Sequence, residues 1–132
     1  MGSMLDMPND KFDKVMNNNI KSNQILCNLV LPEMIDREDG SIIIISSIAA
    51  IKGSAILGAY NISKAADVMI VKNIAAEFGH KNIRANSIAP GFIDTDMTQQ
   101  SDGVNMDELI NEIPLGRFWK PDEVAHLVSF LT

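Results

Sequence analysis

Tyr60 and Lys64 form a Tyr-x-x-x-Lys pair, and Ser47 stands thirteen positions before the tyrosine. If residues 58–79 form a helix, the tyrosine and the lysine lie one turn apart on one face, so the ammonium group stands beside the phenol. A free phenol has a pKa of about 10, too high for efficient proton transfer near neutrality, and a neighbouring positive charge lowers it. The pair therefore predicts a tyrosine that acts as a general acid or base, with the hydroxyl of Ser47 hydrogen-bonded to the reacting oxygen.

Four segments in order resemble the short-chain dehydrogenase/reductase family, of the single-domain kind that includes the 3-oxoacyl-carrier-protein reductases and many sugar and alcohol dehydrogenases. One is the spacing of Ser47, Tyr60 and Lys64. The other three are residues 12–19, similar to the helix that carries the family's catalytic asparagine, residues 86–95, similar to its second cofactor segment, and residues 113–125, similar to the approach to its last long helix. The resemblance covers about residues 5–131, nearly the whole chain.

The resemblance implies an α/β fold with a partial Rossmann-like, doubly wound parallel sheet. It also implies an oxidoreductase that transfers hydride between NAD or NADP and a small carbonyl or hydroxyl substrate. Tyr60 would carry the proton, Ser47 would polarise the substrate oxygen, and Lys64 would also hold the nicotinamide ribose. Asn19 matches the catalytic asparagine and would position a water in a proton relay to Lys64, although Asn17 and Asn18 beside it leave the register open.

The cofactor contacts that the resemblance implies are Tyr60, Lys64, Pro90, Gly91, Ile93 and Thr95. All of them belong to the nicotinamide end. A complete member also has a Gly-rich turn between a strand and a helix to hold the pyrophosphate, and this sequence has no counterpart of it. We therefore expect residues 4–132 to be the catalytic and C-terminal part of a truncated reductase domain, and we interpret residues 1–3 as an expression remnant rather than a signal peptide.

Two classes of function stay open at this point. The chain is either the catalytic part of a nicotinamide-dependent enzyme or an inactive fragment, a structural or interaction remnant that keeps the catalytic residues without a cofactor site. An isomerase, dehydratase or epimerase that uses the same tyrosine and lysine is a more distant alternative. The residues that would choose NAD over NADP belong to the half without a counterpart here.

Composition indicates one compact cytoplasmic domain. The chain has 132 residues, 46% of them hydrophobic and 21% charged, and its single cysteine, Cys27, is typical of a small core residue. No apolar stretch reaches the roughly 18 residues of a membrane span. The net charge is −6, and residues 91–132 hold eight acidic and two basic side chains, which argues against nucleic-acid binding. His80 and His126 have no partners at metal-ligand spacing, so no metal site is expected.

Hydrophobic periodicity predicts alternating helices and strands. The expected elements are a helix over residues 10–34 that Pro32 bends near its end, a strand over 41–46 covered on both faces, a helix over 57–78 closed by Gly79, a strand over 83–88, a mobile polar stretch over 94–105, and helices over 106–112 and 121–131. Ligands bind outside the carboxyl ends of parallel strands. Ser46, interpreted as a packing residue, Ser47 and residues 90–95 fall at that edge.

The two long helices predict self-association. Apolar residues surround the helix over 57–78 more widely than one sheet face can cover, and the helix over 10–34 has the same character. The resemblance implies a homo-oligomer, a dimer or a homotetramer, in which these helices pack across a two-fold axis.

Overall fold

The computed structural model describes residues 2–99 and 105–132. In chain order the elements are α1 (Asn9–Met16), a π-helical turn η1 (Asn17–Lys21), α2 (Ser22–Asp36), β1 (Gly40–Ile45), a 3-10 turn η2 (Ile48–Ala50), α3 (Gly58–Phe78), a 3-10 turn η3 (Gly79–Lys81), β2 (Ile83–Ile88), α4 (Asp96–Gln99), α5 (Met106–Glu112) and α6 (Pro121–Leu131).

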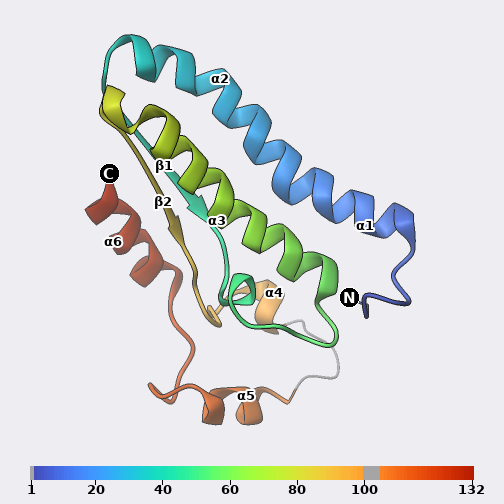
Figure 1. The fold of residues 1–132 in the computed structure, drawn as a ribbon. Coiled ribbons are helices and arrows are strands. Elements are labelled where there is room, and N and C mark those ends of the chain that lie inside the picture. Colours follow the sequence, from blue (N-terminus) through green and yellow to red (C-terminus); the bar gives the residue numbers. More distant parts are fainter. Residues whose placement is uncertain (1, 100–104) are drawn as a thin grey trace.

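The two strands pair in parallel, with Gly40 opposite Ile83 and Ile45 opposite Ile88. A parallel pair needs a long crossover, and α3 supplies it. Helices α2 and α3 run side by side on one side of the strands, and α6 lies on the other side (Figure 1). The prediction of an α/β fold with parallel strands joined by helical crossovers is therefore confirmed.

The core lies between β1, β2 and the two long helices. Its buried members are Cys27, Leu31, Ile42, Ile44, Val71, Ile74 and Ile83. Burial of one such aliphatic side chain contributes about 1.5–3 kcal/mol. We expected the isoleucine strand to be covered on both faces, but Ile45 at its end is 44% exposed. Only the face toward α2 and α3 is buried throughout, because α6 is a single short helix on the other side.

The first long helix is interrupted where the sequence predicted one continuous element. Asn17–Lys21 form a π-helical turn, and α2 then runs past Pro32 to Asp36. Proline removes one backbone donor, and here the helix continues for another turn rather than ending. Turns of this wider kind frequently occur at functional sites, and this one contains Asn19.

At the amino ends of the strands, the turn before β1 contacts the turn before β2. Helix α3 ends at Phe78 and Gly79 follows it, as predicted; a 3-10 turn comes next, and Asn82 takes the left-handed position with φ 58°. Glu38, in the turn before β1, is also left-handed with φ 52°. The side-chain Nδ2 of Asn82 donates to the Glu38 carbonyl at 3.0 Å, and Lys81 Nζ lies 2.8 Å from a Glu38 carboxylate oxygen. These contacts connect the turn before β1 with the turn before β2.

The C-terminal helices begin and end where the sequence predicted them. The side chain of Arg84 on β2 donates to the carbonyls of Leu131 and Thr132, so a cation lies at the negative end of α6. Within the polar stretch expected to be mobile, Asp96–Gln99 form α4, and residues 100–104 lie outside the described part. Among the described residues, no helix combines the length and apolar character needed to cross a membrane.

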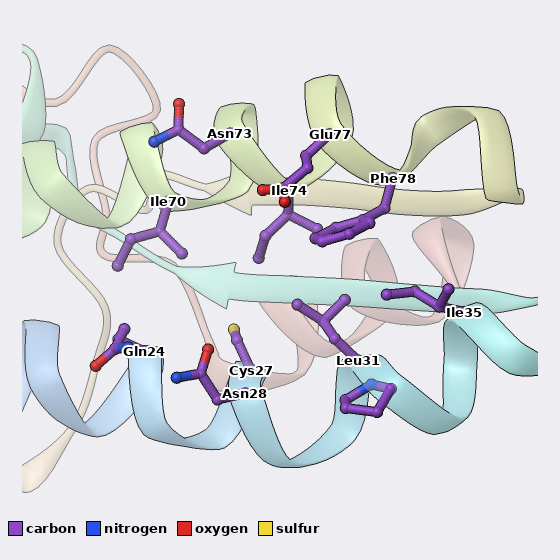
Figure 2. A pocket seen from close by; sticks show the side chains of 11 residues that line it. Gln24, Cys27, Asn28, Leu31, Ile35, Ile70, Asn73, Ile74, Glu77 and Phe78 are labelled. Carbon is purple, nitrogen blue, oxygen red and sulfur yellow. The ribbon is translucent and has the colours of Figure 1, made fainter.

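An open groove runs between α2 and α3. It encloses about 430 Å³, and side chains of the two helices face each other across it, with Cys27 and Leu31 opposite Ile74 and Phe78 (Figure 2). Burial raises the pKa of the Cys27 thiol, as expected for a packing cysteine. Further apolar side chains on these helices are exposed, namely Ile25, Leu26, Leu29, Val30, Ile62 and Met69.

Candidate active site

The carboxyl ends of the two strands bring the predicted segments together. The Ser46 amide donates to the Ile88 carbonyl at 2.7 Å, and the Ile48 amide donates to the Pro90 carbonyl at 2.9 Å. The segment after β1 and the segment after β2 are thus joined by backbone hydrogen bonds, as the parallel arrangement predicts. Helix α3 begins at the same end of the molecule (Figure 1).

Ser47 lies in extended backbone at the start of the 3-10 turn η2. Its Oγ accepts a hydrogen bond from the Ala49 amide at 3.1 Å. Because this bond uses a lone pair of the oxygen, the hydroxyl proton stays available for donation to another group. The neighbouring Ser46 is buried, as its interpretation as a packing residue implies, and its Oγ donates to the Lys64 carbonyl at 2.7 Å. That bond ties the end of β1 to the second turn of α3.

Tyr60 and Lys64 lie one turn apart in the first half of α3, as their spacing predicts. Lys64 Nζ lies 5.9 Å from the centroid of the Tyr60 ring, within the range of a cation–π contact. The Tyr60 side chain is partly exposed, whereas that of Lys64 is only 15% exposed. Lys64 Nζ also donates to the Ile45 carbonyl at 3.0 Å and to Asp67 Oδ2 at 3.0 Å. The ammonium group is therefore held at the carboxyl end of β1.

Asn19 points from the π-helical turn toward α3. Its Nδ2 donates to Ser63 Oγ at 2.9 Å, and that hydroxyl donates to the Tyr60 carbonyl at 2.8 Å. Asn19 and Lys64 also share a cavity of about 350 Å³. The other residues that line it are Asn18, Asn23, Ile43, Ile44 and Ile45. The structure thus brings Asn19 to the side of the lysine that the resemblance pairs with it, and Asn19 is less exposed than Asn17 and Asn18.

Asp67 and Asn23 belong to this cluster, and sequence reasoning missed both. The Asp67 side chain is fully buried; its Oδ2 faces Lys64 and its Oδ1 accepts from Asn23 Nδ2 at 2.8 Å. Asn23 Nδ2 also donates to the Asn19 carbonyl at 2.8 Å. A signal was present: Asp67 is an acidic residue in an apolar stretch, three positions after Lys64, the spacing at which helical side chains meet.

The segment after β2 is held by the approach to α6. Ile93 forms a parallel bridge with Trp119, and the Asp94 amide donates to the Trp119 carbonyl at 2.8 Å. Thr95 is exposed, and its Oγ1 lies 3.2 Å from Thr98 Oγ1. Pro90 and Gly91 connect this segment to the strand. The bridge to Trp119 joins two of the segments that the sequence had singled out separately.

Comparisons with known proteins agree on one family. A family model described as Enoyl-(Acyl carrier protein) reductase matches residues 1–132. Dehydrogenase/reductase SDR family member 4 of Bos taurus is 39% identical over 132 residues, covering 98% of this chain and 47% of that protein. The 3-oxoacyl-[acyl-carrier-protein] reductase FabG of Thermotoga maritima is 38% identical over 128 residues, covering 97% and 52%. The chain spans about half the length of the curated relatives it matches.

Solved structures give the same result. A structure titled "ElxO with NADP Bound" superposes with a TM-score of 0.92 at 28% identity, covering 99% of this chain and 54% of that one. A 3-oxoacyl-[acyl-carrier protein] reductase from Brucella melitensis superposes with a TM-score of 0.93 at 30% identity, covering 98% and 49%.

Proposed function

The chain belongs to the short-chain dehydrogenase/reductase family, and from this membership we propose that it forms the catalytic part of an oxidoreductase that uses NAD or NADP. The proposed reaction transfers hydride between the cofactor and a carbonyl or hydroxyl group of a small substrate. One observation carries the proposal: the ammonium group of Lys64 is held at the carboxyl end of β1, 5.9 Å from the Tyr60 ring centroid, on the edge to which Ser47 and Pro90 also belong.

The hydrogen-bond donors of the site match the hydroxyl groups at the nicotinamide end of a dinucleotide. An ammonium group has three N–H donors, and Lys64 directs two of them at Ile45 and Asp67, so one is left for a ribose hydroxyl. Ile93 and Thr95 would contact the nicotinamide, supported by the bonds that hold their segment. The cofactor, when bound, supplies the hydride chemistry. One structural relative carries NADP by its title, which supports the same cofactor class.

The residues of this chain would move and stabilise the proton. Tyr60 would donate its phenolic proton to a carbonyl oxygen in reduction, or accept a proton from a hydroxyl group in oxidation. Ser47 would donate its free hydroxyl proton to the same oxygen, because its lone pair already accepts from Ala49. Asn19 would position a water molecule in the cavity that it shares with Lys64. That water would take part in a proton relay between Lys64 and the solvent.

Tyr60→Phe tests this proposal in a full-length reductase that contains the sequence. The variant keeps the ring and removes the transferable proton, so kcat should fall by about 10²–10⁴-fold, the range for general acid–base catalysis. The thermal midpoint should stay close to that of the parent, which separates lost chemistry from lost folding. Near-normal kcat in this variant would remove the tyrosine from the mechanism.

We also propose a homo-oligomer, a dimer or a tetramer, that packs through α2 and α3. The support is the exposed apolar set on these helices, in which Leu29 is 71% exposed, and the open groove between them. Leu29→Glu should shift the protein toward monomer in light scattering across micromolar concentrations. Leu115→Glu is the matched control, since Leu115 is 57% exposed but lies outside both helices. Monomer alone in the parent protein would contradict the proposal.

A further inference from the structure

Asp67 is the most completely buried charged side chain among the described residues. Its side chain is 0% exposed, and both carboxylate oxygens have a partner, Lys64 on one side and Asn23 on the other. A buried carboxylate needs such partners, because an unpaired charge in the interior is strongly destabilising. Packing alone does not require a carboxylate at this position, because an apolar side chain of similar size would fill the same volume without a buried charge.

The ion pair determines where the Lys64 ammonium group can point. Lysine has a long side chain with many rotamers, and free lysines lose about 2 kcal/mol of rotamer entropy when they are immobilised. Here the Ile45 carbonyl and the Asp67 carboxylate, each 3.0 Å from Nζ, hold the group from two sides. The remaining N–H is the one that can reach a ligand. Its direction is thus set before any ligand arrives.

The carboxylate also connects Lys64 to the helix that carries Asn19. Asn23 Nδ2 lies 2.8 Å from Asp67 Oδ1 and 2.8 Å from the Asn19 carbonyl, so its two protons have two acceptors. The side chain of Asn19 in turn reaches Ser63 on α3. These bonds form one continuous chain across the two helices, in which Asp67 is the only charged acceptor.

We propose that Asp67 is a positioning residue of the reductase: its buried carboxylate holds the Lys64 ammonium group in the orientation that receives the nicotinamide ribose. The inference rests on the proposed function and deepens it. It acts through Lys64 and requires no contact between Asp67 and the ligand. Preorganisation of this kind raises affinity and rate because the ordering cost is met in folding rather than in binding.

The first test needs no cofactor and uses the chain itself. Acetic anhydride is applied at limiting concentration, and acetylation of each lysine is followed by mass spectrometry. Lys72, exposed on the same helix, is the internal reference. Lys64 should react at least about tenfold more slowly than Lys72 in the folded chain, a conservative bound given the energy of buried ion pairs. Equal rates for the two lysines in the native chain would overturn the inference, whether or not any variant folds.

Two variants then separate the charge from the packing. Asp67→Asn removes the charge and keeps the shape, and it should bring the Lys64 acetylation rate most of the way to that of Lys72. Asn23→Ala removes the other partner of the carboxylate, and it should lower the thermal midpoint while Lys64 stays protected. If Asn23→Ala exposes Lys64 as much as Asp67→Asn does, helix packing rather than the carboxylate holds the lysine, and the inference fails.

The last test is a split of kinetic constants in the full-length reductase. Asp67→Asn should raise KM for the dinucleotide by about tenfold, the loss expected for one misdirected hydrogen bond, and should lower kcat far less than Tyr60→Phe does. Glu33→Gln, which removes an exposed carboxylate paired with Arg37, is the matched control and should change neither constant. A lower thermal midpoint with an unchanged KM would make Asp67 a purely structural residue. Failure of Tyr60→Phe to lower kcat would instead refute the proposed function and leave the acetylation result standing.

Discussion

Two lysine–carboxylate pairs lie at opposite ends of the same two strands and have almost the same geometry. Lys64 and Asp67, near the carboxyl end of β1, are 3.0 Å apart, and their side chains are 15% and 0% exposed. Lys81 and Glu38, at the amino end, are 2.8 Å apart, with exposures of 39% and 62%. Distance alone would rank the second pair as the stronger one. Burial reverses that ranking, because water screens the second pair and not the first.

The two pairs consequently differ in their surroundings. At the amino end, the hydrogen bond and the charge of Lys81 lower the pKa of Glu38, and Glu38 raises the pKa of Lys81 in return. That pair lies beside the hydrogen bond from the Asn82 side-chain amide to the Glu38 carbonyl, and both connect the turn before β1 with the turn before β2. At the carboxyl end, the ion pair is largely enclosed by protein, since its two side chains are only 15% and 0% exposed.

The largest expected effect on stability comes from replacing the lysine of each pair in turn. Lys64→Met leaves the Asp67 carboxylate buried without its cation, which should lower the free energy of unfolding by about 3–5 kcal/mol. Lys81→Met leaves Glu38 in contact with water, so we expect no resolvable change. Urea denaturation of both variants at equal protein concentration measures the difference. Similar losses at the two ends would show that burial does not distinguish the pairs.

A dinucleotide should distinguish the two ends in the chain by itself. We predict that the 132-residue chain binds NADH and NADPH weakly and turns over little or not at all, because its contacts address only the nicotinamide end and the sequence has no Gly-rich turn for the pyrophosphate. In a titration followed by amide NMR, the small shifts should gather around Lys64 and spare Lys81. Micromolar affinity, or steady oxidation of either cofactor with a simple ketone, would show that this chain is an enzyme by itself.

The smallest effect concerns a third, exposed ion pair. Arg117 holds the pKa of Glu123 down to about 2 from 4.5, mainly through a side-chain hydrogen bond, and the Lys120 amide adds a second bond. A carboxyl group with a depressed pKa in the folded state stabilises the fold above its ordinary pKa and loses that contribution as the pH falls. The loss should lie between pH 4.5 and about 2. Glu123→Gln should slightly lower the thermal midpoint at pH 7 and reduce its decline through that window. An unchanged pH dependence would exclude Glu123 as its source.

Much of the fold follows from local pattern. The isoleucine run before Ser46, the apolar period of α3 and the proline that begins α6 each predict their element, and β2, α5 and α6 have the predicted bounds. The one-turn distance between Tyr60 and Lys64 also follows from helix geometry alone. These features depend on residues close in sequence, so composition and spacing are sufficient to determine them.

Tertiary structure decided what depends on distant residues. Asp67 meets Asn23, which is 44 positions away, and only the packing of α2 on α3 makes that acid a buried counterion rather than a surface charge. The left-handed turn at Asn82 contacts Glu38, also 44 positions away, whose carbonyl accepts a hydrogen bond from the Asn82 side-chain amide. The bridge from Ile93 to Trp119 has the same origin. A single sequence determines which groups are present and their local spacing, but the burial that gives a charge its strength is a property of the assembled fold.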